Sequence, residues 1–455
     1  MSKKSLSQKE LERVVESLSD FSAGSSDEYE PSEDETDSSF EDSEEETASE
    51  NENECEYIQG DFQESSTSHP AQNPLHDSED SSTESEAECF QPNIINRIFD
   101  WFEPSDSFRP AKTIPLQRSS EILIDVSKQS TAMEIFHKLF PHSLYLHIVA
   151  CTNQRLELLN KCKGQQQKMI KLTDKGEMQK IIGCMLIMSY NKLPGLKHYW
   201  SQKESMGNRT IENCISRDRY MVLTSKLYFS QPNKPPDATK SYYVDDLISC
   251  LKHSFSKCRQ DSPFQSIDES MTKFKGRSSL KQYMPLKPIK RGIKLWLRCD
   301  ADSGYTYDFN VYVGKGTEVS SDALTLGEKV VKTLVGTIKV PDVVLCFDRF
   351  FTSVNLLETI NFAAVGTCMT NRKNVPSITG KLKKGESKFR CTDTGLMCTK
   401  WQDTKEVLLM SNCHKPNVTK ISKKDKTGQT GEIDCPEAIA FYRQKWEELT
   451  AQINS

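Results

Sequence analysis

The chain has 455 residues, enough for two or three domains, and its 36% hydrophobic content is typical of a soluble protein. It contains no run of eighteen apolar residues, so we expect no transmembrane helix and no membrane partner, and its polar N-terminus differs from a secretory signal. The net charge of −6 hides an asymmetry, because residues 1–90 carry a net charge of −24 whereas residues 91–455 carry +18.

Residues 1–90 form an acidic tail with 28 acidic and 4 basic side chains. Such a segment cannot bury enough apolar surface to offset its ordering entropy, so we expect it to be disordered. It could bind basic nuclear partners or fold over the protein's own basic body. The basic body itself suits a polyanion, most often nucleic acid, although an excess of solvated surface lysines would give the same charge.

Fifteen cysteines are spread from Cys55 to Cys435, and none forms a CxxC pair. Zinc fingers and ribbons need closely paired ligands, so no zinc site is expected. Because no secretion signal is present, we expect the thiols to be reduced, in the cytosol or the nucleus.

A linker over residues 91–130 leads to a region, residues 131–262, in which apolar residues recur at helical spacing. Helices are expected at residues 173–189, 211–227 and 244–255. The first begins where Thr173 and Asp174 can cap it. Its apolar face contains Met178, Ile181, Ile182, Met185 and Leu186. Such faces are interpreted as core, with no chemistry assigned to them.

From about residue 263 the pattern changes, and it predicts an α+β core with a mixed sheet over residues 263–369. In chain order we expect a hairpin formed by residues 293–299 and 305–313 around an Asp-Ser-Gly turn, a buried strand at 342–347, a helix capped by Thr352 or Ser353, and a strand at 363–369.

Two aspartates are candidate metal ligands and catalytic residues. Asp268 follows a short run at residues 264–267, and Asp348 follows the predicted buried strand. Carboxylates that leave adjacent strands can share divalent cations, and Mg²⁺ or Mn²⁺ prefers carboxylate oxygen. The alternative from spacing alone is that Asp348 caps a turn and that Asp268 is a surface acid.

A strongly basic stretch lies between these aspartates, since residues 271–299 contain nine basic side chains and no acidic one. Phe274, Tyr283 and Trp296 are interleaved, so the stretch could neutralise phosphates and stack on bases. A solvated strand face is the alternative, and residues 287–291 could also serve nuclear import. The predicted DNA-binding residues are Lys273, Lys275, Arg277, Lys281, Lys287, Lys290, Arg291 and Lys294.

Several motifs, in the same order, resemble those of piggyBac transposases and, most closely, the vertebrate-type piggyBac transposable element-derived proteins. The matching segments are DESMTKFKGR (268–277), QYMPLKP (282–288), FDRFFTS (347–353), residues 366–376 and 401–411, and three shorter motifs at 199–201, 217–220 and 227–229. Together the resemblance covers roughly residues 130–445.

The resemblance implies an RNase H-like core in which Asp268 and Asp348 hold Mg²⁺ or Mn²⁺, acting in cut-and-paste transposition at TTAA sites. It implies a helical dimerisation and DNA-binding region at 131–262, a β-rich insertion domain at 370–434 and the start of the final core helix at 435–455. DNA is then the expected partner, the chain could form a homodimer, and the nucleus is the expected location.

The sequence departs from the family pattern at the third catalytic aspartate. A gapless extension of the match at residues 435–442 places Thr450 opposite that aspartate, and Glu447 or Glu448 would have to substitute for it. We therefore expect a DNA-binding protein with an incomplete DDD-type site, C-terminally truncated and transposition-incompetent alone. The alternatives are an active transposase whose C-terminus is missing from this chain, and a non-enzymatic interaction scaffold that uses the acidic tail.

Overall fold

The computed structural model describes residues 98–116, 118–162, 168–203, 205–285, 287–314, 324–424 and 430–453, with side chains described as far as residue 446. The chain divides into two units at residue 86, and every described residue belongs to the second. The predicted acidic tail therefore lies outside the described residues. Among the described residues, no helix is both long and apolar enough to cross a membrane.

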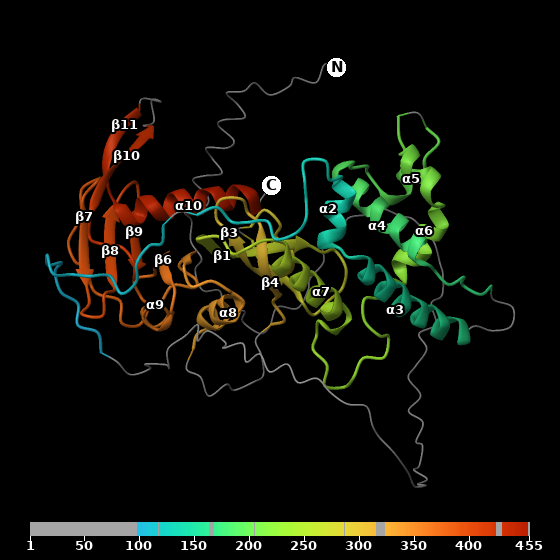
Figure 1. The fold of residues 1–455 in the computed structure, drawn as a ribbon, viewed down its shortest axis with the longest axis horizontal. Helices are drawn as coiled ribbons and strands as arrows, with labels where there is room; N and C mark the ends of the chain where they lie inside the picture. Colours follow the sequence, from blue (N-terminus) through green and yellow to red (C-terminus); the bar gives the residue numbers. More distant parts are fainter. Residues whose placement is uncertain are drawn as a thin grey trace, which may run out of the picture. The chain divides into compact units, whose positions relative to one another are not determined.

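Between residues 132 and 258 the described chain is mainly helical (Figure 1). The helices there are α2 (Ala132–Leu139), α3 (His142–Lys161), α4 (Lys175–Tyr190), the 3₁₀ helix η1 (Leu196–Trp200), α5 (Arg209–Cys214), α6 (Arg217–Ser225) and α7 (Tyr242–Cys258). Asp174 is the N-cap of α4, and its carboxylate accepts the Glu177 backbone N–H. On the predicted face of α4, Met178 and Ile181 are buried, whereas Leu186 is exposed.

The helix predicted over residues 211–227 is instead two short helices, α5 and α6. The chain leaves α5 at Ile215, which has extended backbone angles, and α6 begins after Ser216. The Ser216 hydroxyl accepts the Arg219 backbone N–H, and this N-cap starts a new helix. Apolar periodicity missed the break because buried residues of both helices enter one core cluster.

The rest of the described chain is built on a nine-stranded mixed sheet, in the strand order β2-β3-β1-β5-β6-β9-β8-β7, with β4 also paired to β3. The strands are β1 (Phe264–Lys273), β2 (Lys281–Tyr283), β3 (Arg291–Asp300), β4 (Thr306–Val311), β5 (Val344–Phe347), β6 (Ala363–Thr367), β7 (Ser387–Cys391), β8 (Met397–Gln402) and β9 (Glu406–Ser411). Only β1, β5 and β6 pair in parallel within this sheet.

This arrangement confirms the predicted α+β class and the RNase H-like core. The antiparallel strands β4, β3 and β1 are followed across the sheet by β5 and β6, which run parallel to β1. The predicted hairpin is formed by β3 and β4, the buried strand by β5, and the strand after it by β6. Ser353, one of the two expected caps, accepts the Leu356 backbone N–H at the start of α9 (Val354–Thr359).

Helices cover both faces of the central strands (Figure 1). Leu345 and Phe347 of β5 join a core cluster with α9 and with α8 (Leu326–Val335). The alternate residues, Val344 and Cys346, enter clusters with α10 (Glu437–Ile453) on the other face. Because side chains alternate between the faces of a strand, β5 is apolar throughout and buried on both sides.

The region predicted as a β-rich insertion contributes β7, β8 and β9, which continue the core sheet beyond β6. A separate two-stranded ribbon follows, formed by β10 (Val418–Lys424) and β11 (Thr430–Pro436). The chain then enters α10, which packs against β10 and β11 and also against β1 and β5. The exact domain boundaries stay predictions.

Candidate metal centre and basic strip

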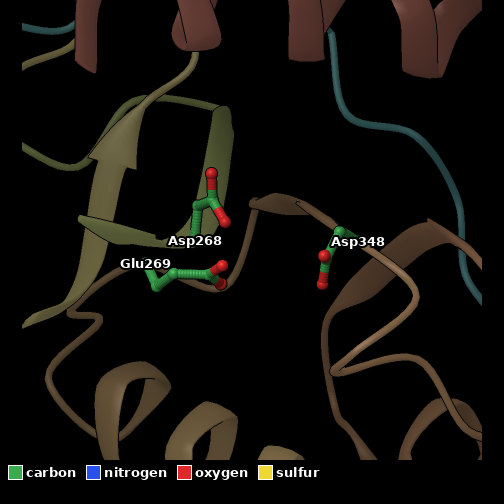
Figure 2. A group of neighbouring side chains, drawn as sticks. All are labelled: Asp268, Glu269 and Asp348. Atoms are coloured by element: carbon green, nitrogen blue, oxygen red, sulfur yellow. The ribbon is translucent and has the colours of Figure 1, made fainter. Parts of the chain in front are cut away.

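The register of the central strands brings Asp268 and Asp348 to the same point of the sheet. Parallel pairing between β1 and β5 ends with Ile267 opposite Phe347, so the next residue on each strand is an aspartate. Beyond this point β1 stays paired with β3, whereas β5 ends and its chain turns away. The sheet therefore divides at the two carboxylates, which Figure 2 shows together.

The position of Asp268 corrects one expectation. We expected it at the end of a short strand, but β1 continues to Lys273 because β3 pairs with it along its length, with Asp268 opposite Leu297. Within the described residues, no strand pairs with β1 on the β5 side after Ile267, so the sheet opens beside Asp268. Asp348, by contrast, follows the last residue of β5 as expected.

Glu269 is a third acid at this point, and it was absent from the predicted site. Carboxylate oxygens of Asp268, Glu269 and Asp348 all lie within 4.8 Å of one another. Adjacent residues of a flat strand face opposite sides, so the strand pattern alone does not group Glu269 with Asp268. The longer glutamate side chain overcomes this, and Figure 2 shows it extending toward the side on which Asp348 lies. We call these three residues the acid cluster.

Asp268 is buried, Glu269 and Asp348 are half-buried, and the charges of the three carboxylates oppose one another. Burial, reinforced by Glu269, raises the pKa of Asp268 well above its usual range. Burial and the Glu269 carboxylate also raise the pKa of Asp348 to about 6, although the Phe350 backbone N–H donates to its Oδ1 at 2.9 Å and opposes the shift. Ionised carboxylates this close destabilise each other unless a cation lies between them.

Two of the eight predicted DNA-binding residues lie against the acid cluster. Lys287 Nζ is 3.1 Å from Glu269 Oε1, and the acids raise the pKa of Lys287 despite its burial. Lys294 Nζ lies 3.9 Å from the centre of the Trp296 ring, and burial lowers its pKa. Burial would raise the pKa of Glu269, but Lys287 and Lys294 lower it below its usual value.

The other six predicted DNA-binding residues occupy β2, the ends of β1 and β3, and the connections between them. Five are exposed, and Lys281 is half-buried, with its Nζ donating to the Gly276 carbonyl at 3.3 Å. The Arg291 guanidinium lies 4.9 Å from the centre of the exposed Tyr283 ring. We call this set the basic strip, and its members are Lys273, Lys275, Arg277, Lys281, Lys290 and Arg291.

Helix α10 also places a side chain near the acid cluster. Tyr442 is buried there, and burial raises the pKa of its hydroxyl well above the usual value, with Asp348 adding to the effect. The Thr367 side chain at the end of β6 hydrogen-bonds to the Tyr442 hydroxyl. Thr450, which the sequence places opposite the third aspartate, and the possible substitutes Glu447 and Glu448 have side chains outside the described residues.

The donor set of the acid cluster fits a hard divalent cation. It consists of three carboxylates, the ligands that Mg²⁺ and Mn²⁺ prefer, and it has no thiol or imidazole. Within the described part of the chain, no second group of three acidic, histidine or cysteine residues has comparable spacing. A cation here would also relieve the repulsion that raises the pKa values of Asp268 and Asp348.

Comparison with known proteins extends these observations. A family model described as "Transposase IS4" matches residues 131–453. Human piggyBac transposable element-derived protein 2 is 24% identical over 304 residues, which cover 59% of this chain and 50% of that protein. Human piggyBac transposable element-derived protein 3 is 25% identical over 248 residues, covering 52% of this chain and 42% of that protein. The chain thus spans about half the length of these relatives or less.

A solved structure also shares the fold. The cryo-EM structure of a piggyBac transposase synaptic complex with hairpin DNA matches with a TM-score of 0.59 and 22% sequence identity. The match covers 70% of this chain and 66% of that one. At this level of identity the likeness establishes a shared architecture, including the mixed sheet and its covering helices.

Proposed function

The chain belongs to the piggyBac group of the IS4-type transposase family, and from that premise we propose that it binds DNA and holds a divalent metal ion in a DDE-type site. The observation that carries this proposal is the convergence of Asp268, Glu269 and Asp348 where β1 and β5 separate. The basic strip on β1, β2 and β3 shares strand β1 with Asp268 and Glu269, and it supports DNA as the ligand.

The two aspartates have separate supports. Asp268 is fixed by β1, which β3 pairs along its whole length, and Asp348 is oriented by the N–H of Phe350. A bound Mg²⁺ or Mn²⁺ would activate an attacking water or hydroxyl and stabilise the leaving oxygen of a phosphodiester. The protein's own task is then to hold the carboxylates in place and to position the DNA backbone.

We propose that the basic strip positions DNA by phosphate contacts. Its exposed lysines and arginines can neutralise phosphates without reading sequence, and Tyr283, with Arg291 against its ring, adds a stacking surface. The cryo-EM relative was solved with hairpin DNA, which favours DNA over another polyanion. A nuclear location follows from such a partner.

We propose DNA binding without transposition as the activity of this chain, because a gapless extension of the family match places Thr450 opposite the third aspartate. A missing ligand weakens metal placement and costs several kcal/mol of transition-state stabilisation, roughly what a metal supplies. The second candidate is an active cut-and-paste transposase at TTAA sites. Glu269 favours this second candidate, since it brings a third carboxylate within 4.8 Å of the two aspartates.

The first test measures DNA binding by fluorescence anisotropy at several salt concentrations, using a duplex that contains a TTAA site. We expect affinity to fall as salt rises, and the double variant K275E/R277E to lose roughly tenfold or more in affinity, because each contact adds to the salt-dependent term. The matched control, K128E/K339E, makes the same charge change at exposed lysines outside the strip. Equal losses in both variants would contradict the proposed surface.

The same protein and duplex with Mn²⁺ separate the two candidates. We expect no strand cleavage and no excision of a TTAA-flanked fragment. Cleavage that disappears in D268N would replace the proposal with the active transposase. If the full chain binds no DNA at any salt concentration, both candidates fail.

A further inference from the structure

The acid cluster contains a cation of its own. Lys287 Nζ lies 3.1 Å from Glu269 Oε1, with the lysine side chain 32% and the glutamate side chain 12% exposed. Three carboxylates whose oxygens lie within 4.8 Å repel one another strongly when little water screens them. An ammonium group at this distance offsets part of the repulsion in the same way that a bound metal ion does.

The chain around Lys287 fixes its backbone and leaves its side chain adjustable. Lys287 lies in the connection between β2 and β3, where Pro285 and Pro288 restrict the backbone. The Met284 N–H donates to the Lys290 carbonyl at 2.8 Å, and the Lys287 N–H donates to the Met284 carbonyl at 3.2 Å. The four-carbon side chain can therefore move its charge away from Glu269 without a change in the loop.

Two neighbouring lysines, Lys294 and Lys290, have surroundings that differ from those of Lys287. Lys294 also lies near the acids, but its Nζ is held over Trp296 at 3.9 Å and near the Phe350 ring at 5.4 Å. Lys290, three residues after Lys287 in the same loop, is exposed. Of these three lysines, Lys287 is the one whose ammonium forms the short ion pair with a member of the cluster.

We propose that Lys287 is a resident cation of the acid cluster and that it competes with the divalent metal ion for the same carboxylates. The inference rests on the proposed metal site and deepens it, because it makes Lys287 a residue that sets metal affinity. In the metal-free protein Lys287 compensates the acids, and metal entry requires its ammonium to leave Glu269. Lys287 therefore differs from the exposed cations of the basic strip, with which the sequence grouped it.

The test compares Mn²⁺ binding, measured by calorimetry or from the free Mn²⁺ signal in electron paramagnetic resonance. The proteins are the full-length wild type, K287M and K290M. We expect K287M to bind Mn²⁺ about tenfold more tightly than wild type, the scale of one lost hydrogen bond to a charged group. K290M, which removes one charge from the same loop, should change the affinity about twofold or less because solvent screens an exposed charge.

The outcomes separate this inference from the proposed function. If wild type binds Mn²⁺, D268N does not, and K287M matches K290M or binds more weakly, the competition is wrong and the metal site stands. If wild type binds no Mn²⁺, or D268N binds it equally well, both the metal site and the competition fail.

A second measurement uses thermal stability in EDTA. K287M should melt below wild type in EDTA, because the acids then lack their cation, and added Mn²⁺ should reverse the difference. K287R keeps the charge and should bind Mn²⁺ within about threefold of wild type, since charge is the property that competes. If K287M does not fold, E269Q is compared with E269Q/K287M, and the double variant must bind Mn²⁺ more tightly than the single one.

Discussion

Burial of a single residue, His414, makes the free energy of unfolding depend on pH. The side chain lies just after β9, with its Nδ1 2.8 Å from the Ser411 hydroxyl and its ring 5.0 Å from that of Phe441. Its Nε2 is buried without a hydrogen-bond partner among the described residues. Burial lowers the pKa of His414 to about 4, so the folded protein holds the ring neutral.

This pKa predicts acid destabilisation in a defined range. The unfolded chain takes up the proton near pH 6.5, whereas the folded protein takes it up only near pH 4. The free energy of unfolding therefore falls as the pH drops from 6.5 to 4, by about 3 kcal/mol from this residue. Denaturant unfolding across that range should show a shallower pH dependence for H414Q than for wild type, and parallel curves would contradict the assignment.

At the same scale, the sequence could indicate some members of the site and not others. Asp268 was named because it follows a short run at residues 264–267 and Asp348 because it follows the apolar strand, and the register places them next to each other. Glu269 could not be named, because its approach depends on side-chain length and on the gap left by β5. Lys287 was grouped with the exposed cations, since sequence does not reveal which lysine of a loop turns inward.

Among the elements, the close approach of β6 to the turn after β5 determines where Asp348 is held. Gly366 of β6 pairs with Phe347, and a Cβ at this position would overlap the Phe347 carbonyl oxygen and the Thr352 hydroxyl. That hydroxyl donates to the Asp348 carbonyl at 2.8 Å. A side chain at Gly366 would therefore push directly against the turn that carries the aspartate.

We predict that G366A destabilises the protein by about 1–3 kcal/mol, the usual cost of overpacking a well-packed site. It should also weaken Mn²⁺ binding, because the turn that holds Asp348 must shift. Gly431 in β11 provides the control, since a Cβ there meets nothing within 4 Å. G431A should change stability by less than about 0.5 kcal/mol. Denaturant unfolding measures the stability of both variants, and Mn²⁺ titration measures their metal affinity. Equal results for G366A and G431A would contradict the predicted overlap at Gly366.

The strands that were predicted correctly from the sequence are those whose apolar pattern is uninterrupted. The hairpin of β3 and β4 and the apolar strand β5 were predicted because their patterns are strong and bounded by turn residues. The division between α5 and α6 was missed because a serine cap interrupts the backbone while the apolar positions continue to match one core. The length of β1 was underestimated because its second half depends on pairing with β3, which local sequence does not encode.

For the whole molecule, the main feature is the separation of charge along the chain. Residues 1–90 carry −24, and residues 91–455 carry +18, although the chain as a whole is only weakly acidic. The sequence alone supplies this asymmetry. It does not supply the arrangement of basic side chains, which depends on how β1, β2 and β3 pair to gather the basic strip at one end of these strands.

An acidic tail attached to a basic body should compete with DNA for that body. Replacing Glu41, Asp42, Glu44, Glu45 and Glu46 by their amides removes five negative charges and keeps side-chain size. We expect this variant to bind DNA several-fold more tightly than wild type at about 50 mM salt. The difference should shrink to less than about twofold at 0.5 M salt, where the screening length falls to a few ångströms.

The control for this prediction replaces five serines of the same tail by alanine, which alters composition and leaves the charge unchanged. Fluorescence anisotropy at both salt concentrations gives the affinities of wild type, the charge variant and the serine control. A charge variant that binds no more tightly at low salt would show that the tail does not screen the basic body. An equal gain at both salt concentrations would point to a specific contact between tail and body, because long-range attraction between exposed charges cannot survive that screening.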